Sequence, residues 1–293
     1  MTESIDAIVV NYNAGNLLQT CIASLHVCPV VSKVIVVDNF SHDDSLRAIQ
    51  HLPGVQIIKN NKNFGFAAAC NMGIEKTDAD YLLFLNPDCS FLPGTMSRIV
   101  EHMRADSAIG MAGGVLINPG DGTEQAGGRR AIPTPWRSFV RAFGLHRYAN
   151  RWPRLFYDFC LHDELLPGAP VAVEAISGAC MLVKREAIDD VGLWDEGYFL
   201  HCEDLDWCMR FRQKGWKILF IPDAKIIHQQ GACSRSRPFF VEWHKHKGML
   251  RFYRKFFRHQ YPGILMWLVT FGVWFRFFLV AGYYLAKRML DKL

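Results

Sequence analysis

The sequence predicts an α/β fold, in which a mostly parallel sheet carries helices on both faces and a helical tail follows. Three observations predict it. Short apolar runs alternate with segments of helical spacing. Polar clusters follow three of these runs, at residues 11–13, 38–43 and 86–88. After residue 234 the composition becomes basic and then apolar. Because ligands of such sheets bind at the carboxyl ends of the strands, the polar clusters mark the expected site.

The first half of the chain supplies most of the expected elements. Runs rich in Val, Ile and Leu predict the strands, and apolar residues spaced by three and four predict the helices between them. In chain order these are a strand at 5–10, a helix at 16–26, a strand at 30–37, a helix at 45–51, a strand at 55–58, a helix at 66–74 and a strand at 81–85.

The pattern is weaker in the second half. Residues 113–168 are rich in Gly, Pro, Arg and Trp, which predicts a long loop region that could act as a lid. Periodicity returns at 171–183, and a helix is expected at 205–213. A strand at 217–221 should end in a turn at Pro222 and Asp223.

Composition excludes several classes of protein. The chain has 293 residues, of which half are hydrophobic and 21% charged, so it is neither disordered nor of low complexity. The nine cysteines form no C-x-x-C pair, and we expect free, mostly buried thiols in a reducing compartment. The first residues lack a basic stretch and an apolar run, so we expect no secretory signal and a folded part in the cytoplasm.

Charge separates the tail from the body. Eight Lys or Arg and one acid give residues 235–258 a balance of +7, and residues 259–293 carry +3. Since the whole chain carries +5, the first 234 residues are acidic, at −5. An acidic body with a basic, apolar tail is not typical of a nucleic-acid binder. It favours a soluble domain followed by a segment that attaches it to a surface.

Residues 264–286 contain one charge, Arg276. As a helix they would extend about 34 Å, enough to cross a hydrocarbon core of about 30 Å. Arg276 would cost about 2.5–3.5 kcal/mol at the centre of a span. The preceding basic segment suits anionic headgroups and favours membrane contact, either across the bilayer or in its interface. The alternative is a buried helical hairpin.

Two clusters at strand ends are suited to a nucleotide. The carboxylate of Asp38 can accept a hydrogen bond from the imide N–H of uracil or thymine, whereas Ser41 and Ser45 are expected as helix caps. Asn63 and Gly65 precede a run of small residues that opens a helix, where a backbone or a phosphate can approach closely. The alternative for this second cluster is a tight turn before a well-packed helix.

Acidic residues and one histidine are candidates for a metal and for a base. Asp88 could hold a divalent cation on a diphosphate, and His228 could complete that site if the fold brings the two together. Glu203 and Asp204 open a helix, where neighbouring carboxylates suit a general base or simply stabilise the helix dipole. Trp194 belongs to an aromatic segment able to stack on a sugar, and Asp206 could instead pair with Arg210.

Taken together, the order and spacing of these motifs resemble glycosyltransferase family 2, and within it the rhamnosyltransferase-like enzymes of bacterial surface-polysaccharide assembly. The resemblance covers residues 4–235. It is carried by Asn11-Tyr12-Asn13, Asp38-Asn39-x-Ser41-x-Asp43, Asn63-x-Gly65-Phe66-Ala67, Asn86-Pro87-Asp88, Gly178-Ala179-Cys180, Val191-Gly192-Leu193-Trp194, Glu203-Asp204-x-Asp206 and His228.

The resemblance implies a GT-A fold that binds a nucleotide-diphospho-sugar. It implies that Asp204 is the catalytic base with Glu203 beside it, and that Trp194 and Asp206 lie on the acceptor side. Asp88 and His228 would hold Mg²⁺ or Mn²⁺, although Asn86 replaces the first acid of the usual Asp-x-Asp. The donor site would comprise Asn11, Asn13, Asp38, Asn63, Gly65, Asn86 and Asp88.

The expected function is an inverting transfer of a sugar, rhamnose from dTDP-rhamnose, to a saccharide or lipid-linked acceptor in cell-surface polysaccharide synthesis. The alternatives are a UDP-hexose donor and a non-catalytic nucleotide-sugar-binding scaffold. A nucleotidyltransferase is disfavoured because residues 11–20 contain no Lys or Arg.

The expected organisation has a GT-A domain at 1–234, divided into a nucleotide-sugar half at 1–118 and an acceptor half at 119–234. The tail at 235–293 would attach the enzyme to the cytoplasmic face of the plasma membrane. A homo-oligomer is possible, and no nucleic-acid partner is expected.

Overall fold

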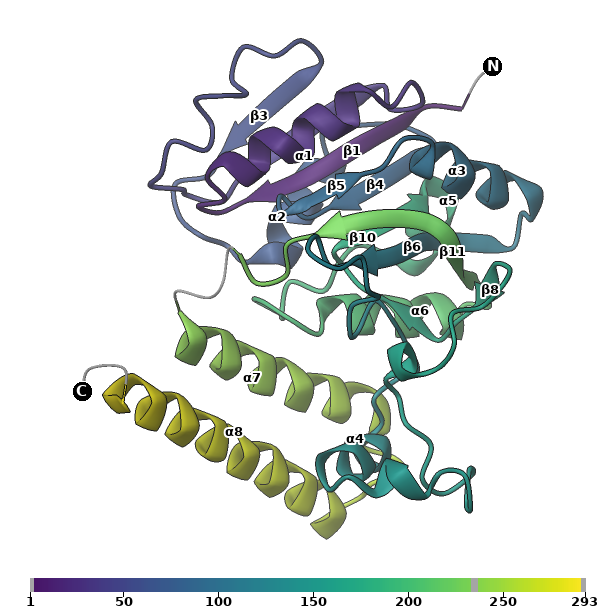
Figure 1. The fold of residues 1–293 in the computed structure, drawn as a ribbon, viewed down its shortest axis with the longest axis vertical. Helices are drawn as coiled ribbons and strands as arrows, with labels where there is room; N and C mark the ends of the chain where they lie inside the picture. The colour runs from purple at the N-terminus through teal and green to yellow at the C-terminus, as the bar shows by residue number, and fades with distance from the viewer. Residues whose placement is uncertain (1–2, 233–236, 291–293) are drawn as a thin grey trace.

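The large sheet that the alternating pattern predicts is present, with helices on both faces (Figure 1). The structure is a computed structural model that describes residues 3–232 and 237–290. The strand order is β3-β2-β1-β4-β10-β6-β11-β5, with β8 paired to β11, and β7 and β9 form a separate two-stranded sheet. The strands are β1 Ile5–Asn11, β2 Lys33–Asp38, β3 Val55–Lys59, β4 Tyr81–Leu85, β5 Cys89–Phe91, β6 Ile109–Ile117, β7 Arg129–Arg130, β8 Val171–Ala172, β9 Ala175–Ile176, β10 Cys180–Lys184 and β11 Lys217–His228.

Eight α-helices and two short 3₁₀ helices complete the part of the chain that the structure describes. They are α1 Asn16–His26, α2 Phe66–Ile74, α3 Thr95–Ala105, α4 Pro135–Ala142, η1 Leu145–Tyr148, η2 Leu161–Asp163, α5 Arg185–Val191, α6 Glu203–Gln213, α7 Pro238–Phe257 and α8 Ile264–Leu290.

The sheet is mixed, with a parallel half that matches the prediction. Strands β3, β2, β1 and β4 run parallel, whereas β10 lies antiparallel between β4 and β6. Strand β11 pairs parallel with β6 and antiparallel with β5. The β-branched residues of β1 are buried on both faces, as expected of a central parallel strand.

Two hydrophobic layers cover the sheet. Helices α1 and α3 bury one side against alternate residues of β1, such as Ala7 and Val9, with Leu18 and Ile22 of α1 in that layer. Helices α2, α5 and α6 pack on the other side, where Ile8 and Val10 point. The alternation follows from the two-residue period of a strand, and it confirms helices on both faces.

Three expectations about local structure are wrong. Residues 45–51 form successive turns rather than a helix, because hydrogen bonds such as that from Ile49 N to Leu46 O span three residues and Ser45 is held by side chains of the strand-end cluster. The turn expected at Pro222 is a bulge inside the continuous strand β11, where the register with β6 shifts. The supposed loop at 113–168 contains the end of β6, strand β7 and helix α4.

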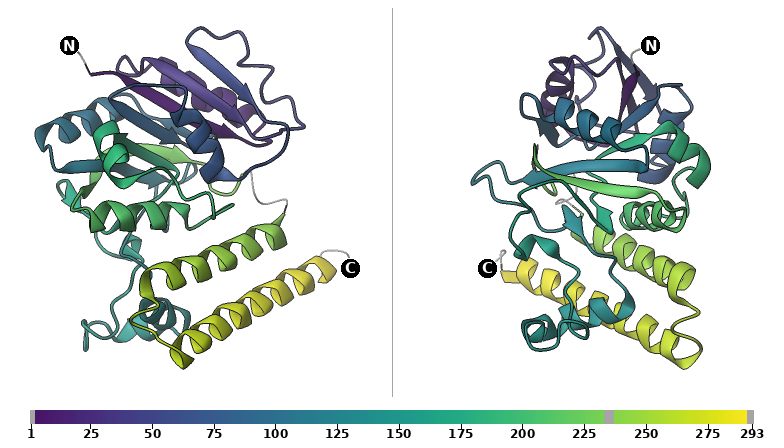
Figure 2. Two further views of the ribbon diagram at one scale, coloured as in Figure 1. Left: turned by 180° about the vertical axis from the view of Figure 1, so that it is seen from behind. Right: turned by 90° about the vertical axis from the view of Figure 1, so that its right-hand side faces the viewer.

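The tail is a helical hairpin in which α7 lies between α8 and the rest of the protein (Figures 1 and 2). Phe252 and Phe257 of α7 are buried in the same core as α2 and α6. No residue of α8 is buried, and among the described residues it is the one helix long and apolar enough to cross a membrane. Its mid-helix charge, Arg276, faces α7, with 3.2 Å between its Nη1 and Nε2 of His246.

The close contact between β6 and β11 gives a test of this packing. We expect Gly114→Ala to lower the free energy of unfolding by about 1–3 kcal/mol, because a Cβ there would stand 2.0 Å from the backbone oxygen of Ala224. Gly120→Ala is the matched control, since nothing lies within 4 Å of its Cβ position. Chemical denaturation measures the free energy of unfolding of both variants. A Gly114→Ala variant as stable as Gly120→Ala would contradict the close packing of β6 against β11.

Candidate active site

The polar clusters at the strand ends come together at one edge of the sheet. Asn11 and Asp38 stand opposite each other where the parallel strands β1 and β2 end. Strand β4, on the other side of β1, leads directly into Asn86-Pro87-Asp88. His228 ends β11 opposite Cys89 in the antiparallel pair with β5, which places it beside Asp88. Residues from four strands therefore meet at one place.

Asp38 lines a hollow of about 580 Å³ with Phe40, Asp43 and Lys59 among its walls. Its Oδ1 accepts a hydrogen bond of 2.7 Å from Asn11 Nδ2, and its Oδ2 accepts one from the amide of Ser41. A carboxylate has about four lone-pair positions, so Asp38 retains capacity for a ligand N–H.

Asn11 itself is fully buried and donates to Asp38, Ser41 and Ser45. It therefore holds the cluster together from behind, and the direct nucleotide contact expected of it stays a prediction. Ser41 and Ser45 bind Asn11 instead of capping a helix, so that expectation is also wrong. Asn13 adopts a positive φ of 53° and accepts a hydrogen bond from the amide of His42.

Asn39, to which the sequence analysis gave no role, connects the two predicted nucleotide segments. Its Nδ2 donates to Asn63 Oδ1 and Gly65 O, and its Oδ1 accepts from Asn60 Nδ2 and the amide of Phe64. Gly65 is required at its position because φ is +90° and a Cβ would stand 2.6 Å from the oxygen of Phe199. This network fixes residues 60–65 beside Asp38.

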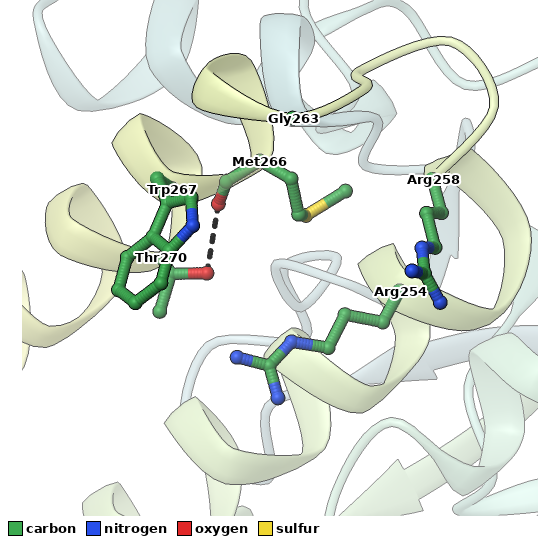
Figure 3. Close-up of a pocket in the computed structure, with 6 residues that line it drawn as sticks. All are labelled: Arg254, Arg258, Gly263, Met266, Trp267 and Thr270. Atoms are coloured by element: carbon green, nitrogen blue, oxygen red, sulfur yellow. Dashed lines mark hydrogen bonds between the residues drawn. The ribbon is translucent and has the colours of Figure 1, made fainter.

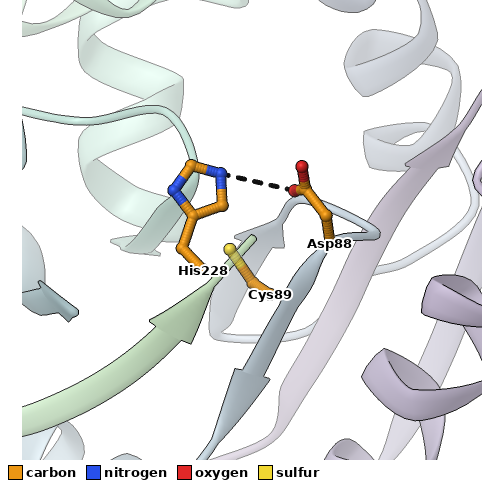
Figure 4. A group of neighbouring side chains, drawn as sticks. All are labelled: Asp88, Cys89 and His228. Carbon is orange, nitrogen blue, oxygen red and sulfur yellow. Dashed lines mark ion pairs between the residues drawn. The ribbon is translucent and has the colours of Figure 1, made fainter. Parts of the chain in front are cut away.

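Asp88 and His228 form a buried pair suited to a divalent cation (Figure 4). His228 Nε2 lies 3.4 Å from Asp88 Oδ1, and that oxygen has no hydrogen-bond partner among the described residues. An unsatisfied buried carboxylate oxygen beside an imidazole nitrogen fits Mn²⁺ or Mg²⁺. Cys89 lies within the same group, and burial raises the pKa of its thiol well above the ordinary value.

Gln125 determines which nitrogen of His228 is free. The Nε2 of Gln125 donates to His228 O at 2.6 Å and to Asn118 Oδ1 at 2.9 Å, which turns its Oε1 toward His228 Nδ1 at 2.8 Å. The Nδ1 nitrogen must then carry the proton, and the lone pair of Nε2 points to Asp88. The residues thus present a prepared pair of ligands.

The two adjacent acids at the start of α6 lie in different environments. Burial raises the pKa of the Glu203 carboxyl well above the ordinary value, with the charge of Asp204 adding to the effect, and its Oε2 lacks a partner among the described residues. Asp204 is partly exposed, and its Oδ2 forms an ion pair with Arg130 Nη2 and accepts from the amide of Gly178. The first therefore keeps its proton to a higher pH than an exposed Glu does, whereas the second is held in an ion pair.

The backbone of Gly178 and Ala179 connects Asp204 to the segment that carries Asp88, the partner of His228. The amide of Gly178 donates to Asp204 Oδ2, and the carbonyl of the next residue, Ala179, accepts from the amide of Asn86 at 2.9 Å. The start of α6 and the Asn86-Pro87-Asp88 segment therefore flank the same short connection into β10.

Trp194 and Asp206, expected on the acceptor side, are core residues. Trp194 is 2% exposed and contacts Phe66, Phe84 and Trp207 with its ring, so no face is left for a sugar. Asp206 is fully buried and pairs with Arg210 at 2.7 Å and with Lys255 of α7 at 2.6 Å. Neither side chain is exposed to an acceptor in this structure, and the acceptor roles stay predictions.

Sequence reasoning missed Gln125 and Arg130 as well as Asn39. Asn39 had a signal, because it follows Asp38 at a strand end. Gln125 and Arg130 lie in the segment that showed no periodicity, and nothing in the sequence indicates that they meet His228 and Asp204.

Two family models match the chain. The family model described as Glycosyl transferase family 2 matches residues 6–192, and one described as Glycosyl transferase family group 2 matches residues 127–290.

Several curated relatives carry rhamnosyltransferase names. An N-acetylglucosaminyl-diphospho-decaprenol L-rhamnosyltransferase of Mycobacterium tuberculosis is 29% identical over 254 residues, 81% of this chain and 80% of that protein. Rhamnosyltransferase WbbL of Escherichia coli is 26% identical over 81% of this chain and 88% of its own length. The dTDP-rhamnosyl transferase RfbF of Shigella flexneri is 26% identical over 79% of this chain and 71% of its own.

Solved structures share the fold. A mannosyltransferase of Pyrobaculum calidifontis in complex with GDP-Man and Mn²⁺ superposes with a TM-score of 0.59 at 15% identity, over 88% of this chain and 65% of that one. GalNAc-T7 with UDP, GalNAc and Mn²⁺ gives a TM-score of 0.58 at 19% identity, over 78% of this chain and 44% of that one.

The Gln125 contacts predict metal affinity. Gln125→Leu should weaken Mn²⁺ binding by about tenfold, because loss of such a partner typically costs 10- to 100-fold. Asp88→Asn removes a carboxylate ligand and should abolish binding. Titration of free Mn²⁺ by electron paramagnetic resonance gives the constants, and a Gln125→Leu variant that binds like the parent would refute the positioning role.

Proposed function

The chain belongs to glycosyltransferase family 2, and as a member of that family it is a glycosyltransferase. From this membership we propose that it transfers rhamnose from dTDP-rhamnose, with inversion, to a saccharide or lipid-linked acceptor in cell-surface polysaccharide synthesis. The observation that carries the proposal is the approach of the buried Asp88 and His228 pair to Asp204 through Gly178 and Ala179. The names of the curated relatives support the choice of donor.

The nucleotide of the donor would occupy the hollow beside Asp38. A free lone pair of Asp38 accepts the imide N–H of thymine, and the network of Asn39 with Asn63 keeps residues 60–65 in place around it. Lys59 and Arg47 line the hollow together with Asp43 and Asp44.

Asp88 and His228 would hold the divalent cation, with Asn86 and Asp88 on the donor side. When bound, the cation offsets the negative charge that develops on the leaving diphosphate. Gln125 keeps the Nε2 lone pair of His228 directed at this position.

Asp204 is the better placed general base. Its Oδ2 is occupied by Arg130 and Gly178, and its Oδ1 accepts from its neighbour's amide, Leu205 N, at 2.8 Å. A second lone pair of Oδ1 is free to take the proton of the acceptor hydroxyl. As that oxygen attacks the anomeric carbon from the face opposite the diphosphate, the bond to the diphosphate breaks and the proton passes to Asp204.

Helix α8 would attach the enzyme to the cytoplasmic face of the membrane. Its outer face exposes large apolar side chains, Trp267 at 76% and Phe271 at 69% among them. Trp136 and Phe139 of α4 are exposed as well, and Figures 1 and 2 place α4 and α8 at the same end of the molecule, opposite β3. Apolar exposure of this extent is typical of a surface that meets lipid.

The two acids at the start of α6 make a matched pair for testing the base. Asp204→Asn should lower kcat by about 10²- to 10⁴-fold, since it removes the proton acceptor. Glu203→Gln should leave kcat within about threefold, because Gln has the shape of the protonated acid. Initial rates with saturating donor and acceptor measure both, and the reverse ranking would assign the base to Glu203.

The same residue predicts a pH effect on stability. The folded protein holds the Glu203 proton more tightly than the unfolded chain does, because burial raises the carboxyl pKa. Stability is therefore lost as the pH rises above the ordinary value for Glu and toward the raised one. Relative to the parent chain, Glu203→Gln should gain in melting temperature between pH 5 and pH 9. If the melting temperatures of both proteins changed equally with pH, the burial of a protonated Glu203 would be contradicted.

The donor is tested with a panel of dTDP-, UDP- and GDP-sugars and Mn²⁺. We expect dTDP-rhamnose to give the largest rise in melting temperature, because binding to the folded state stabilises it. We also expect the fastest release of nucleotide from this donor. Preference for a UDP-hexose would overturn the choice of donor and leave the family assignment intact.

A further inference from the structure

A second cavity, of about 400 Å³, lies between the end of α7 and the start of α8 (Figure 3). It is lined by two arginines of the α7 end and by residues of the α8 start, namely Arg254, Arg258, Gly263, Met266, Trp267 and Thr270. Arg254 and Arg258 are exposed, and no carboxylate of the described residues pairs with either of them. Two unpaired guanidinium groups beside a tryptophan suit a ligand that joins an anionic group to an apolar chain.

The surface that continues from this cavity is apolar. Phe271, Phe275 and Phe278 follow Trp267 at spacings of three and four along the exposed side of α8, and Leu268 is exposed as well. A ligand with its anionic group at the arginines could therefore lay a hydrocarbon chain along the helix. This combination matches an amphiphile and not a free inorganic anion.

The hairpin also decides how α8 meets a bilayer. Helix α7 runs beside α8, with ring contacts such as Trp243 on Trp274. The opposite side of α7 is fixed to the protein body by the pairing of Lys255 with Asp206. Because this charged helix covers one side of α8, lipid can reach only the outer side. Helix α8 should thus lie in the plane of the interface.

The cavity lies at the other end of α7 from the donor-site segment around Tyr12. Arg237, at the start of α7, donates from Nη1 to the hydroxyl of Tyr12, next to Asn11. Arg254 lies 17 positions further along, which is about 26 Å at 1.5 Å per residue.

From these observations we infer that the cavity binds the phosphate headgroup of an anionic membrane phospholipid, whose acyl chain lies along α8. Arg254 and Arg258 bind the phosphate oxygens, and Trp267 lies at the level of the headgroups. The inference rests on the proposed membrane attachment and deepens it: the attachment selects anionic lipid at a defined site.

Vesicle binding of the full chain tests the inference. Vesicles of phosphatidylcholine alone are compared with vesicles containing 30% phosphatidylglycerol, at about 0.15 M salt. The parent chain should bind both, and the anionic vesicles at least tenfold more tightly. Arg254→Gln with Arg258→Gln should weaken binding to anionic vesicles by about 20-fold and leave binding to neutral vesicles unchanged.

Two further variants separate a site from general electrostatics. Arg98→Gln with Arg104→Gln removes the same charge from α3, at the opposite end of the molecule, and should change binding by less than twofold. Arg254→Lys with Arg258→Lys keeps the charge but loses the planar guanidinium groups that bind a phosphate through two hydrogen bonds. It should weaken binding to anionic vesicles by at least threefold.

Each remaining outcome has one meaning. A parent chain that binds neither kind of vesicle refutes membrane attachment itself. Binding to both kinds with equal affinity refutes the anionic site and leaves attachment standing. Equal losses in the α7 and α3 double variants, or a lysine variant that binds like the parent, would show that general charge and not this cavity governs the selection.

Discussion

The antiparallel pairing of β11 with β5 is the constraint on which the site depends. Asn86-Pro87-Asp88 follows β4 and leads directly into β5, so the position of β5 is tied to the central parallel strands. The pairing sets His228 opposite Cys89, and the amide of Gln229 donates to Asp88 O at 2.9 Å. A shift of one residue would turn the His228 side chain to the other face of the sheet and separate it from Asp88.

Burial assigns different roles to residues that look alike in the sequence. Glu203, Asp204 and Asp206 all occupy the first turn of α6. Asp206 is enclosed and joins α6 to α7 through Lys255. Glu203 is buried, which raises its pKa, and Asp204 is partly exposed and pairs with Arg130. In the tail, Arg276 stays exposed and places its Nη1 3.2 Å from Nε2 of His246 on α7.

The sequence was sufficient to predict the parallel half of the sheet, because buried strands and amphipathic helices leave clear periods in β1, α1 and β4. It also predicted the strand-end clusters around Asp38 and Asp88. It could not predict the turns at 45–51, where side-chain contacts from distant Asn11 outweigh local helical spacing. Nor could it place Gln125 and Arg130 beside His228 and Asp204, since those contacts bridge 103 and 74 residues and leave no local pattern.

The measurement that tests the central claim most directly is anomalous diffraction from crystals soaked with Mn²⁺ and dTDP. A single strong manganese peak should lie between Asp88 Oδ1 and His228 Nε2, with the thymine in hydrogen-bonding contact with Asp38 and the diphosphate oriented toward Asp204. A manganese peak elsewhere, or a nucleotide bound away from the ends of β1 and β2, would contradict the convergence of these strands on one donor site.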